Sequence, residues 1–203
     1  MEMTSLAPHR GRPREFCSEQ ALAAALRVFW SKGYEGASMA DLTEAMGITK
    51  PSLYACFGNK EQLFIKALDL YEREKMDYVA LALAEPTARK VAEHMLRGAL
   101  DKQTGVNEPR GCLGVISSVA CGAEAESIRH CVLERSAKAK HALVERMEHA
   151  KTDGDLPAHV DVEGLTSYLY AILQGMAVQA GSGATRAELE RMVETSLMVW
   201  PSR

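Results

Sequence analysis

Apolar residues recur at helical spacing along almost the whole chain, and no run shows the alternation of β-branched residues that marks a strand. Aromatic residues make up only 6% of the 203 residues, which also favours helices over sheets. A hydrophobic fraction of 47% is too high for a disordered chain and ordinary for a globular one. We therefore predict an all-α fold of about nine helices, with a small N-terminal group and a larger C-terminal bundle.

Signals for export, membrane insertion and disulfide formation are weak in this sequence. Residues 1–15 contain no apolar core of the kind that a secretory signal needs. The longest stretch without a charge, residues 164–185, carries two glutamines and four glycines and is too polar for a comfortable membrane span. The five cysteines are odd in number and form no CxxC pair, which argues against a disulfide framework and a zinc site. We expect a cytoplasmic protein with no membrane partner.

Composition and periodicity divide the chain into three parts. Residues 1–15 are rich in Pro, Gly and Arg and are predicted to form a flexible basic arm. Residues 16–60 contain three short helical patterns, and residues 61–203 contain longer ones. The sequence thus predicts a small three-helix domain followed by a large helical domain.

The segment from Ser38 to Phe57 has the pattern of a helix-turn-helix. Ser38 and Thr49 are predicted N-caps of two short helices, and Gly47 between them can adopt the positive φ of a tight turn. The apolar residues of this segment are spaced for burial, so short or polar side chains face outward on the second helix. Such a face can enter a major groove. A plain helical hairpin, without a function in DNA binding, is the alternative that the pattern leaves open.

The run ITKPSLYACFGNKEQLF, preceded by FWSKGYEGASMADLTEAMG, closely resembles the N-terminal domain of the TetR family of transcriptional regulators. Over the rest of the chain the resemblance is weaker, although QGMAVQAGSGATRAELERMVETSL looks like the closing helix pair of many members. The resemblance implies a sequence-specific DNA-binding regulator, most often a repressor. The sequence differs from the family pattern at position 56, where family members often have an imidazole or aromatic side chain and this chain has Cys56.

The resemblance also implies which residues contact DNA. Ser38 and Thr49 would hold phosphates at helix N-termini, and Lys60 would clamp a phosphate. The second helix of the motif would contact base edges and backbone through Lys50, Ser52 and Tyr54. The basic arm would reach along the backbone or into a minor groove through Arg10, Arg12 and Arg14. For the arm, a solvated tail without contacts stays the alternative.

In this family the C-terminal bundle forms a homodimer and encloses a small apolar effector. A two-fold dimer would place two recognition helices on a pseudo-palindromic operator of double-stranded DNA. Soft and aromatic side chains on the middle helices are the predicted pocket: Met95, Leu96, Cys112, Ile116, Cys121, Tyr168 and Met176. Apolar stripes on the last two helices are the predicted dimer interface: Leu169, Ile172, Leu173, Met192, Val193, Leu197 and Trp200.

Three other functions are weighed against a ligand-released repressor. Cys56 or another cysteine could make the chain a redox-responsive regulator, because basic neighbours lower a thiol pKa. A helical enzyme is disfavoured because no ordered catalytic motif occurs, and a protein-interaction module could use the same bundle. We expect no cofactor and no metal, since the helical row His141, Glu145 and His149 lies among lysines and suits a solvated face.

The formal charge of −3 does not exclude a nucleic-acid partner, because the charge is unevenly distributed. Residues 1–60 contain seven Lys or Arg against six Asp or Glu, a balance of +1, and the remaining residues contain seventeen against twenty-one, a balance of −4. The acidic total therefore belongs to the predicted C-terminal domain.

Overall fold

The computed structural model describes residues 13–119, 122 and 125–201, with side chains from Ser18 onward. These ranges contain ten helices and no strand, as predicted for an all-α chain. The first four helices are α1 (Pro13–Gly36), α2 (Met39–Met46), α3 (Lys50–Phe57) and α4 (Lys60–Lys75). The other six are α5 (Asp77–Leu83), α6 (Ala88–Gln103), α7 (Leu113–Val119), α8 (Glu126–Thr152), α9 (Val162–Gly181) and α10 (Arg186–Met198).

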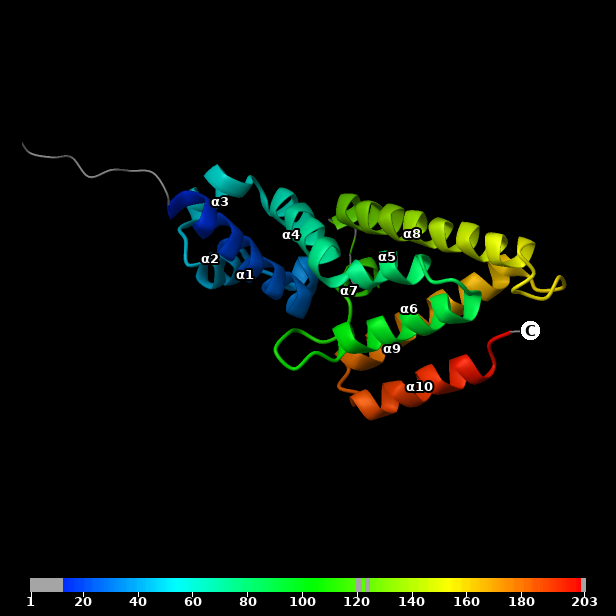
Figure 1. Ribbon diagram of the computed structural model, residues 1–203. Coiled ribbons are helices and arrows are strands. Elements are labelled where there is room, and N and C mark those ends of the chain that lie inside the picture. Colours follow the sequence, from blue (N-terminus) through cyan, green and yellow to red (C-terminus); the bar gives the residue numbers. More distant parts are fainter. Residues whose placement is uncertain (1–12, 120–121, 123–124, 202–203) are drawn as a thin grey trace, which may run out of the picture.

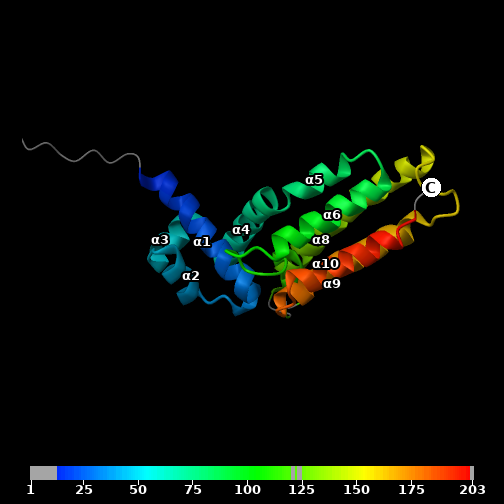
Figure 2. The same ribbon diagram turned by 60° about the horizontal axis from the view of Figure 1, so that its bottom comes forward.

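Helices α1 to α3 lie at one end of an elongated molecule, and the C-terminus lies near the opposite end (Figures 1 and 2). Helix α4 runs from α3 to the bundle of α5 to α10 (Figure 1). None of the helices in the described ranges combines the length and the apolar character that crossing a bilayer requires.

The sequence predicts about nine helices, and the helix that it does not predict is α5. This helix begins directly after α4, and Met76, the residue between them, provides no side-chain cap. Helix α5 has only seven residues and no capping residue, so helix caps and long apolar periodicity could not predict it. Tyr78 and Ala82 are its buried residues, and they pack into the C-terminal core.

The N-terminal core forms where α1 packs against α4 and α2. Phe29 and Trp30 of α1 are at most 1% exposed. The Phe29 ring meets Phe64 edge to face with 5.1 Å between centroids, and Trp30 meets Tyr71 in the same way at 4.9 Å. Both partners belong to α4, so two aromatic contacts fix the angle between these helices.

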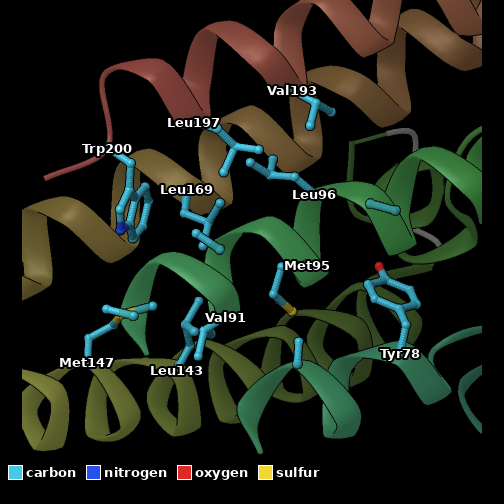
Figure 3. Close-up of a cluster of buried hydrophobic side chains, with 14 of the residues drawn as sticks. Tyr78, Val91, Met95, Leu96, Leu143, Met147, Leu169, Val193, Leu197 and Trp200 are labelled. Atoms are coloured by element: carbon cyan, nitrogen blue, oxygen red, sulfur yellow. The ribbon is translucent and has the colours of Figure 1, made fainter. Parts of the chain in front are cut away.

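The C-terminal core is built around α6, which packs against α5, α9 and α10. Figure 3 shows Val91 of α6 close to Leu143 and Met147 of α8, with Leu169 of α9 and Leu197 of α10 on the other side of α6. These five side chains are at most 5% exposed. Helix α6 is apolar on a wide face because it lies between other helices.

Shortening a side chain at the centre of this core should destabilise the chain. We expect Leu143→Ala to reduce the free energy of unfolding by about 2–5 kcal/mol, because Leu143 is 1% exposed and its neighbours cannot fully close the cavity. Leu81→Ala is the matched control, since Leu81 is 58% exposed and its loss should change stability by less than about 0.5 kcal/mol. Urea unfolding at one fixed protein concentration measures both, and equal losses would contradict the placement of Leu143.

Candidate DNA-binding surface and adjoining cavity

Two capped helix ends and one glycine fix the geometry of α2 and α3. Ser38 caps α2, and its side chain and that of Asp41 form a reciprocal capping box. Gly47 ends α2 in the left-handed region at φ 63°, where its amide donates to carbonyls of the last turn. Thr49 then caps α3 through the amide of Ser52. The predicted helix-turn-helix is therefore present, with the caps and the turn where the sequence placed them.

Helix α3 buries one side and leaves a short polar surface outward. Leu53 and Phe57 face the N-terminal core, whereas Lys50, Ser52 and Tyr54 are exposed, Tyr54 to 47%. The hydroxyls of Thr49 and Ser52 lie 2.9 Å apart and share a hydrogen bond at the start of α3. An exposed face of hydroxyl, amine and phenol groups without bulk between them suits a groove lined with hydrogen-bonding base edges.

Lys60, the first residue of α4, is held in place by an aromatic ring. Its Nζ lies 4.6 Å from the ring centroid of Tyr34, a cation–π distance. Partial burial lowers the pKa of Lys60, and the nearby charge of Glu35 opposes that shift. Asn59 caps α4 in a capping box with Gln62, and this helix begins three residues after α3 ends. An ordered cation at a helix N-terminus is a suitable phosphate contact.

The Asp41 carboxylate in the first turn of α2 is paired with a lysine of α1. Asp41 accepts from Lys32 Nζ at 2.7 Å and from the amide and hydroxyl of Ser38. The hydrogen bond from Lys32, followed by those from Ser38, lowers the pKa of Asp41 to about 2. Asp41 is thus ionised at neutral pH, and its charge is paired with that of Lys32.

The predicted arm falls mostly outside the described residues. Arg10 and Arg12 precede them, and Arg14 lies in the first turn of α1 with its side chain outside the description. Helix α1 begins at Pro13, within the segment 1–15 that the sequence assigned to the arm.

A cavity of about 180 Å³ lies at the end of the bundle that meets the N-terminal domain. Residues of α4, α6, α7, α8 and α9 and of the segment from Met76 to Val79 line it. Of the predicted pocket residues, Met95 and Cys112 line this cavity. Leu96 and Met176 are buried in the C-terminal core beside other side chains, and Ile116 packs against the N-terminal core. Tyr168 is 39% exposed on α9, and Cys121 lies outside the described residues.

Sequence reasoning missed the polar groups of the cavity. Tyr71, Tyr78 and Tyr170 line it from α4, α5 and α9, and Gln103 lines it from the end of α6. Burial raises the pKa of Tyr170 to about 12 and also raises the pKa values of Tyr71 and Tyr78, so the three phenols stay neutral. Gln103 follows Leu96, Ala99 and Leu100 at helical spacing, so its place on the apolar face of this helix is the signal that could have found it.

The residues predicted for the dimer interface lie mostly inside one subunit. Leu169, Val193, Leu197 and Trp200 are at most 5% exposed because α9 and α10 pack them against α6. The other three, Ile172, Leu173 and Met192, are partly buried against the same core, and Leu173 also lines the cavity. The large apolar side chains that this helix pair and its C-terminal end leave exposed are Tyr168, Val178, Met198 and Val199.

Two other sequence patterns are placed on the surface. His141 lies 3.5 Å from Glu145 on α8, and both side chains are exposed. In the described ranges no three His, Cys, Asp or Glu side chains are grouped as metal ligands. Cys56 is exposed on α3, whereas Cys112 and Cys131 are half-buried.

Comparison with known proteins places both parts of the chain in one family. The model described as "Bacterial regulatory proteins, tetR family" matches residues 21–67, and "Tetracyclin repressor-like, C-terminal domain" matches residues 89–195. The HTH-type transcriptional repressor ComR of Escherichia coli (strain K12) is 33% identical over 95% of this chain and 92% of its own length. The repressor BdcR of the same strain is 36% identical over 51% of this chain and 52% of its own.

The likeness extends to three dimensions. The solved structure of a cysteine mutant of the TetR family transcriptional regulator CifR, complexed with 26-bp double-strand operator DNA, superimposes with a TM-score of 0.86. The two sequences are 39% identical, and the match covers 95% of this chain and 100% of that one. These relatives are named as repressors and regulators, which does not favour the redox-responsive alternative.

The Asp41 carboxylate should make the stability of the N-terminal domain depend on acid pH. Its folded pKa of about 2 lies below the ordinary 3.8, so its ionised form stabilises the fold fully above about pH 5. That contribution is lost as the pH falls toward 2. We therefore expect Asp41→Asn to be less stable than the parent chain at pH 6, and the difference to shrink toward pH 2.5.

Thermal unfolding at a series of pH values measures the effect of Asp41. Lys32→Met should remove part of the same pH-dependent stabilisation, because Lys32 is the main cause of the lowered pKa. Parallel pH profiles for the parent and Asp41→Asn would contradict the assignment.

Proposed function

This chain belongs to the TetR family of bacterial regulatory proteins, and we propose that it is a homodimeric repressor released from its operator by a small molecule. The observation that carries the proposal is the exposed polar surface of α3 at one end of the molecule (Figure 1), together with a cavity in the bundle that α4 and α7 line. In this proposal residues 16–60 read DNA and residues 61–203 form the effector-binding and dimerisation domain. The chain then acts in the cytoplasm, where bacterial operators are, and as a regulator and not an enzyme.

The DNA contacts divide into two kinds. Lys50, Ser52 and Tyr54 on the outer face of α3 enter the major groove and contribute sequence choice. Ser38, Thr49 and Lys60 lie at the N-termini of α2, α3 and α4 and hold phosphates, which fixes the register of the protein on the duplex. The arm residues Arg10, Arg12 and Arg14 extend the contact to the adjacent minor groove.

The dimer contact that we propose uses the outer face of α9. Tyr168, Ala171 and Val178 are exposed at intervals of three and seven residues, so they share one side of the helix with the half-buried Gly175. Small residues between larger apolar ones allow two helices to approach closely. Met198 and Val199 extend the apolar surface at the C-terminal end of α10.

Release from the operator requires that a molecule bound in the cavity changes the position of α1 to α3. Two helices, α7 and α4, contact both the cavity and the N-terminal core. Helix α7 lines the cavity through Gly114, Val115 and Ser118, while Leu113 and Ile116 of the same helix pack against the N-terminal core. Helix α4 lines it through Leu68, Tyr71 and Glu72 and begins with Lys60. An effector that displaces either helix therefore changes the placement of α3.

A gel shift with the DNA that flanks the gene of this protein tests the proposed function. The parent chain should shift a palindromic fragment, whereas an enzyme or an interaction module should shift none. Lys60→Ala should weaken binding to all sequences and reduce the slope of log K against log salt by about 0.9 per subunit, or about 1.8 for a dimer.

Lys138→Ala is the matched control for Lys60, because Lys138 is an exposed lysine on α8 that is paired with Glu134. It should leave both affinity and salt slope unchanged. An unaltered slope for Lys60→Ala would remove Lys60 from the phosphate contacts.

A charge on the outer face of α9 should separate the dimer. We expect Val178→Glu to sediment as a monomer, because two like charges would be buried across a two-fold axis. Leu81→Glu is the control, since Leu81 on α5 is 58% exposed and Val178 is 53% exposed. Analytical ultracentrifugation distinguishes the two, and a stable dimer of Val178→Glu would show that another surface mediates dimerisation.

A further inference from the structure

The last residues of α1 contact both the cavity helix α7 and Lys60. Gly33 interrupts α1 with a φ of 71° and a ψ of 174°, a backbone conformation that favours glycine, and α1 is kinked there. A Cβ at Gly33 would lie 3.5 Å from Cγ2 of Ile116 on α7. The ring of the next residue, Tyr34, has its centroid 4.6 Å from Nζ of Lys60. The kinked end of α1 thus contacts a helix of the cavity wall and a proposed phosphate contact through neighbouring residues.

The ring beneath Lys60 is packed into the N-terminal core. Tyr34 stacks on Phe29 with 6.3 Å between ring centroids and an interplanar angle of 17°. It also meets Phe64 of α4 edge to face at 5.3 Å. Both phenylalanines are fully buried, so the Tyr34 ring has a defined position. The Lys60 ammonium is therefore held at a fixed place next to the end of α1.

One carboxylate acts on both neighbours of this segment. Glu35 accepts a hydrogen bond from the amide of Gly122 at 2.8 Å, and Gly122 lies three residues after Val119, the last residue of α7. The negative charge of Glu35 also raises the pKa of Lys60, against the lowering caused by burial. The same side chain thus interacts with the segment that follows the cavity helix and with the ammonium group.

The approach of the Glu35 carboxylate leaves no room for a side chain at Gly122. A Cβ at Gly122 would lie 2.9 Å from Oε1 of Glu35. Among the described residues, the three atoms nearest to that Cβ all belong to the Glu35 carboxylate. The φ of Gly122 does not lie in the left-handed region, so its backbone conformation is open to other residues. An alanine at this position would therefore act first on the contact with Glu35.

We propose that Glu35 is a positioning residue through which the cavity helix α7 controls the phosphate contact of Lys60. While α7 is in place, the Gly122 amide holds the carboxylate. When α7 moves, the carboxylate loses this donor and pairs with the Lys60 ammonium, for which it then competes with a DNA phosphate. This inference rests on the proposed function and adds the step by which a displacement at the cavity reaches one DNA contact.

Gly122→Ala tests this step in the full chain, because it displaces the carboxylate from the amide and Gly122 does not line the cavity. In a gel shift with the palindromic fragment, we expect this variant to bind about threefold more weakly per subunit, or about tenfold for a dimer. In the Glu35→Gln background the same change should have no effect, because a neutral amide cannot replace the carboxylate as a partner of Lys60. An equal loss in both backgrounds would overturn the proposal.

Glu35→Gln alone separates the charge of Glu35 from its structural role. The variant keeps an oxygen that accepts from the Gly122 amide and removes the negative charge beside Lys60. It should bind the fragment about threefold more tightly per subunit, and this gain should vanish in the Lys60→Ala background. A residue with only a structural role would weaken binding when replaced.

Glu74→Gln is the matched control, because Glu74 is an exposed carboxylate near the C-terminal end of α4, paired with Arg73. It makes the same change of net charge far from Lys60 along α4 and should leave the affinity nearly unchanged. Equal tightening by Glu74→Gln and Glu35→Gln would assign the effect to net charge and overturn the proposal.

An NMR titration of the Lys60 side chain gives a result without DNA. Its Cε resonance is identified by its loss in Lys60→Arg. We expect Glu35→Gln to lower the pKa of Lys60 and Gly122→Ala to raise it. An unchanged pKa in both variants would overturn the inference even if the parent chain shifts its operator. A chain that shows both changes but shifts no DNA keeps the contact between Glu35 and Lys60 and loses the proposed function.

Discussion

The packing of α1 against α4 is the contact on which the rest of this molecule depends. Phe29 and Trp30 place two aromatic rings against Phe64 and Tyr71, each pair edge to face and nearly free of solvent. Helices α2 and α3 have little core of their own and are positioned by this pair. Since Tyr71 also lines the cavity, the contact that orients α3 continues directly into the proposed effector site.

A second connection runs from α1 to α7 and bypasses α4. Trp30 donates from Nε1 to the carbonyl of Gly111 at 3.2 Å, and the Glu35 carboxylate accepts from the amide of Gly122 at 2.8 Å. These two bonds hold the chain on both sides of α7, which lines the cavity with one face and meets α1 with the other. Because α4 and α7 both line the cavity and both pack against α1, an occupant that displaced either helix would change the contact of that helix with α1.

The sequence predicted local structure better than contacts between helices. Caps such as Ser38, Thr49 and Asn59 act within four residues, so the helix-turn-helix and the start of α4 could be placed from the sequence. Periodicity identified apolar faces but not their partners. Helix α9 is apolar on more than one side, and only the structure shows that Leu169 faces α6 whereas Val178 faces outward. The cavity depends on the register of several helices at once, which explains why Met95 could be proposed while Tyr78, on the unpredicted α5, could not.

The electrostatics of the N-terminal domain explain why one copy would be a weak DNA binder. Its balance of charge is only +1 over residues 1–60, and Lys32 is committed to Asp41. Lys50 and Lys60 then lie at the proposed DNA surface, and Lys66 of α4 lies against the end of α3, where its Nζ donates to the carbonyl of Cys56 at 3.5 Å. The arginines of the arm would add to these cations. Affinity for DNA rises with the number of phosphates neutralised, so a domain with few free cations gains little from non-specific binding. A dimer carries two such domains, which doubles the number of phosphates neutralised and also requires two correctly spaced half-sites in the DNA. A weakly basic reading domain on an acidic body therefore favours selectivity for the operator over attachment to DNA in general.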